Sequence, residues 1–123
     1  MNETVTERYR AIAKVAGRIH CLLRSEVEKL GFEDDELVLL PPVDAVYHLE
    51  KDPADGRFSL VGEWRDDKGM KFGSLLFHAD GSFFVEQDII RPHPAKKQWF
   101  VEAVSAWGRD DNIKSEARLL PMP

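Results

Sequence analysis

KFGSLLFHADGSFFVEQDII, residues 71–90, is the stretch that decides the fold, because apolar residues alternate on both sides of a central Asp80-Gly81 pair. An Asp-Gly pair between two such segments is typical of a two-residue type I′ turn, in which both central residues have positive φ. The stretch therefore predicts an antiparallel hairpin. This turn predicts four cross-strand pairs, which are His78 with Phe83, Phe77 with Phe84, Leu76 with Val85, and Leu75 with Glu86.

Two more strands are expected before this hairpin, over residues 45–51 and 58–65, with turn-rich segments at 53–56 and 67–69. A three-residue loop with Gly69 in the left-handed conformation pairs Asp66 with Met70 and gathers the apolar residues on one face. That predicted apolar face carries Tyr47, Leu49, Phe58, Leu60, Trp64, Phe72, Leu76, Phe83 and Val85.

A long helix is expected at the N-terminal end of the chain. Thr4 begins a Thr-Val-Thr-Glu capping box, in which the Thr4 hydroxyl accepts from the Glu7 amide. Apolar residues then recur at spacings of three and four until Gly31, which suits a helix C-cap. We expect this stripe to cover the apolar face of the sheet. Its members are Val5, Tyr9, Ile12, Ala16, Ile19, Leu23, Val27 and Leu30.

The remaining segments complete the predicted fold. Residues 31–44 form an acidic, proline-containing connection, in which Leu37–Leu40 is an edge strand or a buried segment. Pro92-His93-Pro94 is expected to end the sheet, and residues 95–107 are expected to form a second helix with Trp99 and Trp107 on one side. Residues 109–123 form an extended tail that includes either a last strand or an arm.

The predicted fold class is α+β in a single domain over residues 1–123. It has a long N-terminal helix packed on a four- to five-stranded antiparallel meander, and a C-terminal helix. An apolar fraction of 43%, a charged fraction of 32% and a net charge of −5 are typical of a folded water-soluble protein. The negative charge disfavours nucleic acid as a partner. The chain lacks a long apolar run and a basic leader, so we expect no membrane partner and a cytoplasmic location, which the single Cys21 also suits.

The second sheet face combines acidic and aromatic residues, and it is the predicted binding surface. Either the C-terminal helix covers part of it or a partner does, because an apolar patch of this kind is rarely left in water. The candidate partner-binding residues are Glu50, Glu63, Leu75, Phe77, Phe84, Glu86 and Asp88.

Catalytic and metal-binding patterns are weak in this sequence. Glu63, Glu86 and Asp88, with His48, are the residues that a small hydrolase would use, but their strands place Glu63 and Asp88 roughly 10 Å apart, and His48 and Glu86 farther still. The histidines have no close ligand spacing, and no glycine-rich phosphate loop occurs, so we expect no metal and no cofactor.

The order of elements and the hairpin Leu75-Leu76-Phe77-His78-Ala79-Asp80-Gly81-Ser82-Phe83-Phe84-Val85-Glu86-Gln87-Asp88 resemble the YezG-like bacterial immunity proteins. In that family an apolar strand, a polar glycine turn and an aromatic-acidic strand precede a terminal helix. The chain departs from this pattern by its shorter length and by Pro92-His93-Pro94 after the hairpin. The resemblance implies a cytosolic protein that neutralises a toxin, and it implies no catalytic residues.

The sequence thus predicts a binding protein, most concretely an acidic immunity or inhibitor protein for a basic toxin domain. The alternative is a dimeric secretion-type chaperone or adaptor, which is also small and acidic, so a homodimer is left open. A small hydrolase is the enzyme alternative. A stable dimer with an extended effector segment would favour the chaperone, and a concave pocket joining the carboxylates would favour the hydrolase.

Overall fold

The computed structural model describes residues 4–33 and 35–122, so Asp34 of the predicted connection and Pro123 of the predicted tail lie outside it. Within these described residues, six strands follow the helix in chain order and pair as one antiparallel meander. The strands are β1 (Val46–Lys51), β2 (Phe58–Arg65), β3 (Lys71–Phe77), β4 (Phe83–Pro92), β5 (Trp99–Arg109) and β6 (Asn112–Pro121). The α+β class and the antiparallel sheet are confirmed, with six strands rather than four to five.

The helix α1 spans Val5–Leu30 and begins and ends where its capping signals predict. Thr4 Oγ1 accepts a hydrogen bond of 3.1 Å from the Glu7 backbone N–H. Gly31 ends the helix with a φ of 100°, a left-handed conformation that glycine adopts without strain. The helix residues buried against the sheet all belong to the predicted stripe and are Ala16, Ile19, Leu23, Val27 and Leu30.

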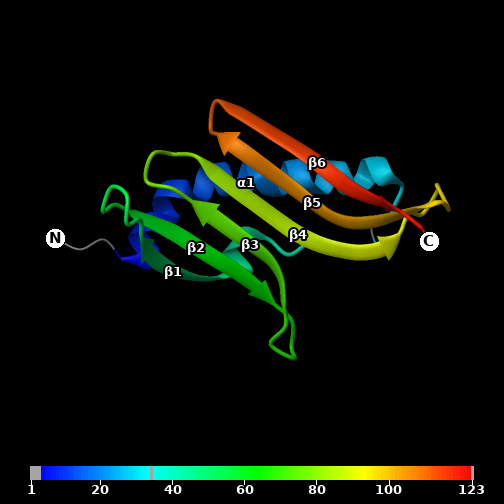
Figure 1. Cartoon of the computed structure of the whole chain (residues 1–123), viewed down its shortest axis with the longest axis horizontal. Coiled ribbons are helices and arrows are strands. Elements are labelled where there is room, and N and C mark those ends of the chain that lie inside the picture. The colour runs from blue at the N-terminus through cyan, green and yellow to red at the C-terminus, as the bar shows by residue number, and fades with distance from the viewer. Residues whose placement is uncertain (1–3, 34, 123) are drawn as a thin grey trace.

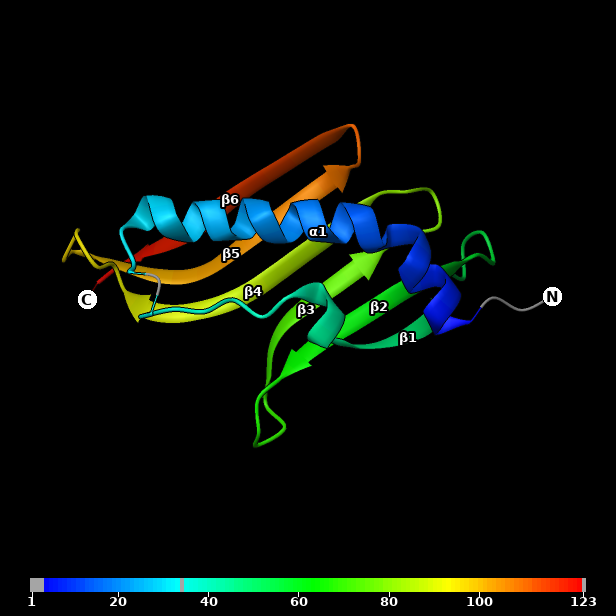
Figure 2. The same cartoon turned by 180° about the vertical axis from the view of Figure 1, so that it is seen from behind.

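One face of the sheet is covered by α1, which lies behind the sheet in Figure 1 and in front of it in Figure 2. The connection from α1 to β1, with the short 3-10 helix η1 (Pro42–Asp44), lies on this same side. Gln87 holds the connection through two hydrogen bonds, accepting from the Leu40 N–H at 3.1 Å and donating to the Leu40 carbonyl at 3.3 Å. The segment Leu37–Leu40 is therefore a connection that is hydrogen-bonded to the sheet through Gln87, rather than an edge strand.

The predicted C-terminal helix is wrong, because Trp99–Arg109 forms β5 and pairs with β4 on one side and β6 on the other. Trp99, Ala103 and Trp107 recur every four residues, a spacing that suits a helix face but is also even, as in a strand. The sheet therefore continues past Pro92, where β4 ends. Of the two forms expected for the tail, the last strand is the one that occurs.

The turn of the β3–β4 hairpin has three residues, 79–81, rather than two. The His78 N–H donates to the Ser82 carbonyl at 2.9 Å, and the Gly81 N–H donates to the His78 carbonyl at 3.1 Å. Gly81 has a φ of 93°, whereas Asp80 is not among the described residues with positive φ, so the predicted type I′ turn is wrong. The observed pairs are displaced by one residue, with Phe77 opposite Phe83, Leu76 opposite Phe84, and Leu75 opposite Val85.

A β-bulge in β3 shifts the pairing with β2 by one residue as well. The predicted loop before β3 is confirmed by the hydrogen bond of 2.9 Å from the Asp66 N–H to the Met70 carbonyl. The pairing then jumps from Lys71 to Gly73, which leaves Phe72 as the extra residue. Every later residue of β3 therefore changes face, as expected of a single-residue bulge.

The bulge overturns the predicted placement of three β3 side chains. Leu75 and Phe77, expected on the exposed face, lie in the core beneath α1 and are 0% and 2% exposed. Leu76, expected in the core, alternates to the opposite face and is only partly buried.

Candidate binding surface on the uncovered sheet face

The sheet face opposite α1, here called the open face, is not covered by any helix of the described residues (Figure 1). Strand alternation sends every second side chain onto it. Because the strands pair in a continuous meander, side chains of successive strands form rows that cross the sheet. Two such rows, one apolar and one acidic, define the candidate binding surface.

The first, called the apolar row, runs across four strands from β2 to β5. Its members lie directly opposite one another in the order Val61, Leu76, Phe84 and Trp107. The row covers three interstrand spacings, or about 14 Å. Phe84 is 41% exposed at its middle. An aromatic anchor with apolar neighbours on both sides is a typical centre of a protein interface.

The second, called the acidic row, lies beside the apolar row and alternates glutamate with serine. Its members are Glu63, Ser74, Glu86, Ser105 and Glu116, from β2 to β6. Successive glutamates are separated by two interstrand spacings, or about 10 Å. Glu116 is exposed, whereas the side chains of Glu63 and Glu86 are 27% and 24% exposed.

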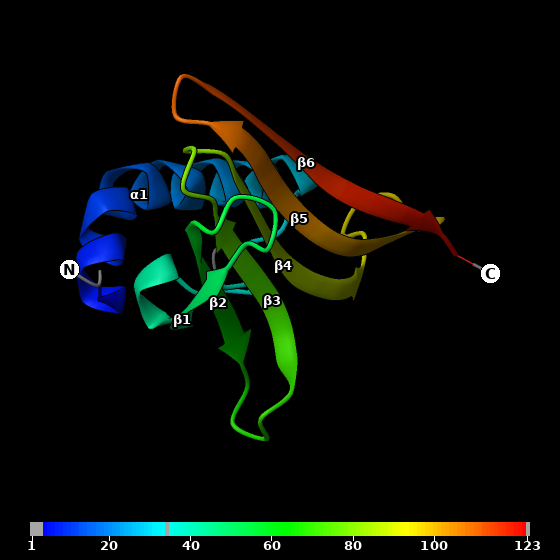
Figure 3. The ribbon, with the colours of Figure 1, turned by 60° about the vertical axis from the view of Figure 1, so that its left-hand side comes forward.

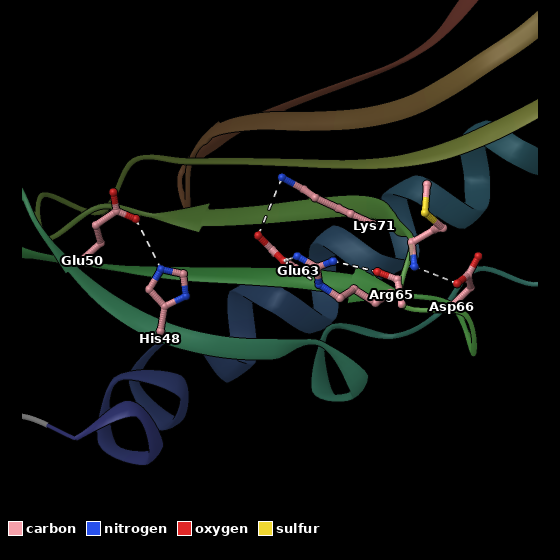
Figure 4. Close-up of polar contacts among 8 residues, drawn as sticks. His48, Glu50, Glu63, Arg65, Asp66 and Lys71 are labelled. Atoms are coloured by element: carbon pink, nitrogen blue, oxygen red, sulfur yellow. Dashed lines mark hydrogen bonds and ion pairs between the residues drawn. The ribbon is translucent and has the colours of Figure 1, made fainter.

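Basic side chains form ion pairs with some of these carboxylates, but they are fewer than the carboxylates, so negative charge remains in excess. In Figure 4 the Glu63 carboxylate lies 2.6 Å from Arg65 Nη2 and 3.9 Å from Lys71 Nζ. Arg118 pairs with Glu86, and its Nη1 lies 3.7 Å from Glu102 Oε2. Across the strands of this face, six carboxylates stand against five basic side chains: Glu50, Glu63, Glu86, Asp88, Glu102 and Glu116 against Arg65, Lys71, Arg109, Lys114 and Arg118. Arg109 is in addition paired with Asp80 of the β3–β4 turn.

Burial and neighbouring negative charges both change the pKa of Asp88 on this face. Partial burial raises the pKa of its carboxyl group above the ordinary value, and the neighbouring Glu86 and Glu102 raise it further. A positive group placed above these three carboxylates would favour their ionised forms. The surface is thus suited electrostatically to a basic group.

The open face gathers five of the seven residues proposed from the sequence, namely Glu50, Glu63, Phe84, Glu86 and Asp88. The other two, Leu75 and Phe77, are buried on the opposite face. Leu76 and Trp107 belong to the apolar row and were missed. The even spacing from Ala103 to Trp107 was the available signal for Trp107, because both residues lie on the open face of β5. Nothing in the sequence marks the bulge at Phe72.

The residues of the hydrolase alternative do not converge. His48 lies on the edge strand β1, three strands away from Glu86, and its Nε2 lies 3.4 Å from Glu50 Oε2 instead (Figure 4). Glu63 and Glu86 are each engaged by a basic side chain. Four surface cavities, of about 260 to 440 Å³, are lined by other residues. None of these four cavities therefore joins the carboxylates of the hydrolase alternative.

Two further features bear on the kind of site. In residues 4–33 and 35–122, no three or more His, Cys, Asp or Glu side chains group closely enough to hold a metal ion. The described part of the chain also has no helix with the length and hydropathy that crossing a membrane requires.

No family model, no curated protein and no solved structure matches this chain.

Proposed function

We propose that this chain is a binding protein whose open face takes a basic protein partner, most concretely a toxin domain that it inhibits. The observation that carries the proposal is the apolar row, with Phe84 exposed at its centre on a face without a covering helix in the described chain. Exposed apolar surface of this kind, rimmed by polar residues, is typical of protein interaction sites.

The apolar row would supply most of the binding energy. Phe84 and Trp107 are large aromatic side chains directly opposite one another, and burying such side chains dominates interface energetics. The row crosses the strands, so its length of about 14 Å suits two to three turns of an amphipathic helix laid across the sheet. A partner with an apolar stripe of that length is the simplest fit.

The acidic row would supply steering and orientation. Glu86 and Glu116 lie beside the apolar row on β4 and β6, so a partner with basic residues flanking an apolar stripe meets an excess of negative charge at this end of the row. Glu63, at the other end, is paired with Arg65 and Lys71. Complementary charges at the rim act mainly by speeding association. The formal charge of −5 acts in the same direction at longer range.

Inhibition of a basic toxin is the specific form of this proposal. The excess of carboxylates on the open face supports it. The resemblance to YezG-like immunity proteins supports it through the hairpin alone, because β5 takes the place of the terminal helix of that family. A cytosolic immunity protein meets its target in a reducing compartment, which a chain with the single cysteine Cys21 suits.

A photo-crosslinking pair tests the proposal. p-Benzoylphenylalanine is placed at position 84 and, as a matched control, at position 58, because Phe58 is similarly exposed, at 46%, but has the alternation of the covered face. Irradiation in cells that express the protein naturally should give a specific adduct from position 84 alone. Equal adducts from both positions, or none from position 84, would contradict an interface on the open face.

The identity of the crosslinked partner then separates the finer alternatives. If it is a toxin, adding the purified chain should abolish its activity in proportion to complex formed. If activity is unchanged, the inhibitor role fails while the binding face remains. A captured effector in extended conformation would instead support the secretion-chaperone alternative.

A further inference from the structure

β6 is a long strand at the edge of the sheet. It spans ten residues, Asn112–Pro121, and within the described residues it pairs with β5 alone. Figures 1 and 3 show it along the outer rim, with no other element beyond it. Its outward backbone N–H and C=O groups are therefore a template for another strand.

The side chains of β6 alternate in a way that suits one particular strand, a second β6. Lys114, Glu116 and Arg118 point to the open face. Ser115 and Ala117 point to the helix side, where Ser115 Oγ donates a hydrogen bond of 2.9 Å to Glu26 of α1. In a two-fold antiparallel pair, the residue at the centre lies opposite its own copy.

The register of such a pair is defined by its centre, which is the residue that lies opposite its own copy. Few choices of this residue are compatible with the charges of β6. A centre at Glu116 places this carboxylate against its own copy and Lys114 against Arg118, so like charges meet. A centre at Ser115 brings Lys114 opposite Glu116 but shortens the shared ladder to residues 112–118. A centre at Ala117 brings Glu116 opposite Arg118 twice and allows pairing from Ile113 to Pro121.

We propose that β6 pairs antiparallel with β6 of a second copy of this chain, with Ala117 opposite Ala117. The two sheets then join into one, and because the two-fold axis runs normal to the sheet, both open faces lie on the same side. The inference is independent of the partner proposed for the open face, since an edge contact leaves that face uncovered.

A charge-swap pair tests this dimer. Glu116→Arg alone places Arg against Arg at both symmetric contacts, and Arg118→Glu alone places Glu against Glu. Mixed in equal amounts, the two variants restore opposite charges at both contacts. Sedimentation equilibrium from micromolar to millimolar concentration should show a dimer for the parent chain, at least about tenfold weaker dimerisation for each variant alone, and a dimer for the mixture.

Several results would overturn the proposal. A parent chain that stays monomeric throughout this concentration range would exclude the proposed dimer. Single variants that dimerise like the parent place the contact elsewhere, and a mixture that stays monomeric excludes the pairing of Glu116 with Arg118. Circular dichroism confirms that each variant folds, because Arg118 also pairs with Glu86.

Disulfide trapping tests the register separately, in a Cys21→Ser background because Cys21 is exposed. Ala117→Cys should give a covalent dimer on mild oxidation, since directly opposite Cα atoms lie about 4.5 to 5.5 Å apart, within disulfide range. Ser115→Cys is the matched control on the same side of β6, and its two copies would lie too far apart. Crosslinking through position 115 in place of 117 would contradict the register.

Discussion

Truncating Leu75 and Leu76 in turn makes the same chemical change at two adjacent positions of β3 with opposite surroundings. Leu75 is fully buried under α1, whereas Leu76 lies in the apolar row with solvent on one side. Leu75→Ala removes three buried carbons, worth about 2.4 kcal/mol at about 0.8 kcal/mol each. The cavity left behind adds about 1 to 1.5 kcal/mol, so the free energy of unfolding should fall by about 3.5 to 4 kcal/mol.

Leu76→Ala should lower the free energy of unfolding by only about 1 kcal/mol, because its side chain is already partly exposed. Urea denaturation of both variants measures the difference, with an unchanged slope as the check that unfolding stays two-state. Equal losses in the free energy of unfolding, or a larger loss for Leu76→Ala, would refute the bulge at Phe72. Such a result would support the predicted register, in which Leu76 rather than Leu75 faces the core.

Three other changes probe the sheet and its charges. Gly73→Ala places a Cβ 2.8 Å from the Glu86 carbonyl oxygen, so we expect a loss of about 1 to 3 kcal/mol in urea denaturation; parental stability would contradict this close approach. Gly81→Ala forces a side chain into positive φ and should cost about 1 to 2 kcal/mol, unless the turn differs from the one described. Asp88→Asn should raise the denaturation midpoint at neutral pH, because the carboxyl pKa is raised in the folded state and ionisation there is unfavourable. That gain should vanish below the ordinary carboxyl pKa, and a gain that persists in acid would assign it to another cause.

The features predicted correctly from the sequence are those fixed by local chemistry. The Thr4 cap and the Gly31 stop each depend on residues within one helical turn, and the loop between Asp66 and Met70 depends on one glycine. Such signals act over a few residues, so tertiary packing seldom overrides them.

Register depends on single-residue events that the sequence marks poorly. The bulge at Phe72 reverses the faces of β3, and the third turn residue before β4 reverses them again. These two differences from the predicted pairing cancel in β4. Phe84, Glu86 and Asp88 were therefore placed on the correct face, while Leu75 and Phe77 were not.

The strand β5 was missed because a spacing of four fits a helix and a strand alike, whereas β6 was left open as a last strand or an arm. β5 is an interior strand of the described sheet, next to the edge strand β6, and is buried on both sides near Ala103 to Ala106. It therefore lacks the alternation of apolar and polar residues that marks a half-exposed strand. Without β5 and β6, the sequence could predict neither Trp107 in the apolar row nor Glu116 in the acidic row.

The central claim, that the open face is the binding surface, is tested most directly by association kinetics with the captured partner at two ionic strengths. Glu86→Lys with Asp88→Lys changes the open face, and Glu28→Lys with Glu33→Lys makes the same change in net charge on exposed residues elsewhere. We expect the first pair of substitutions to slow association at least about tenfold at low salt, with a smaller effect at high salt, and the control pair to have little effect. Unchanged association by the first pair, or equal slowing by both, with folding confirmed by circular dichroism, would contradict the claim.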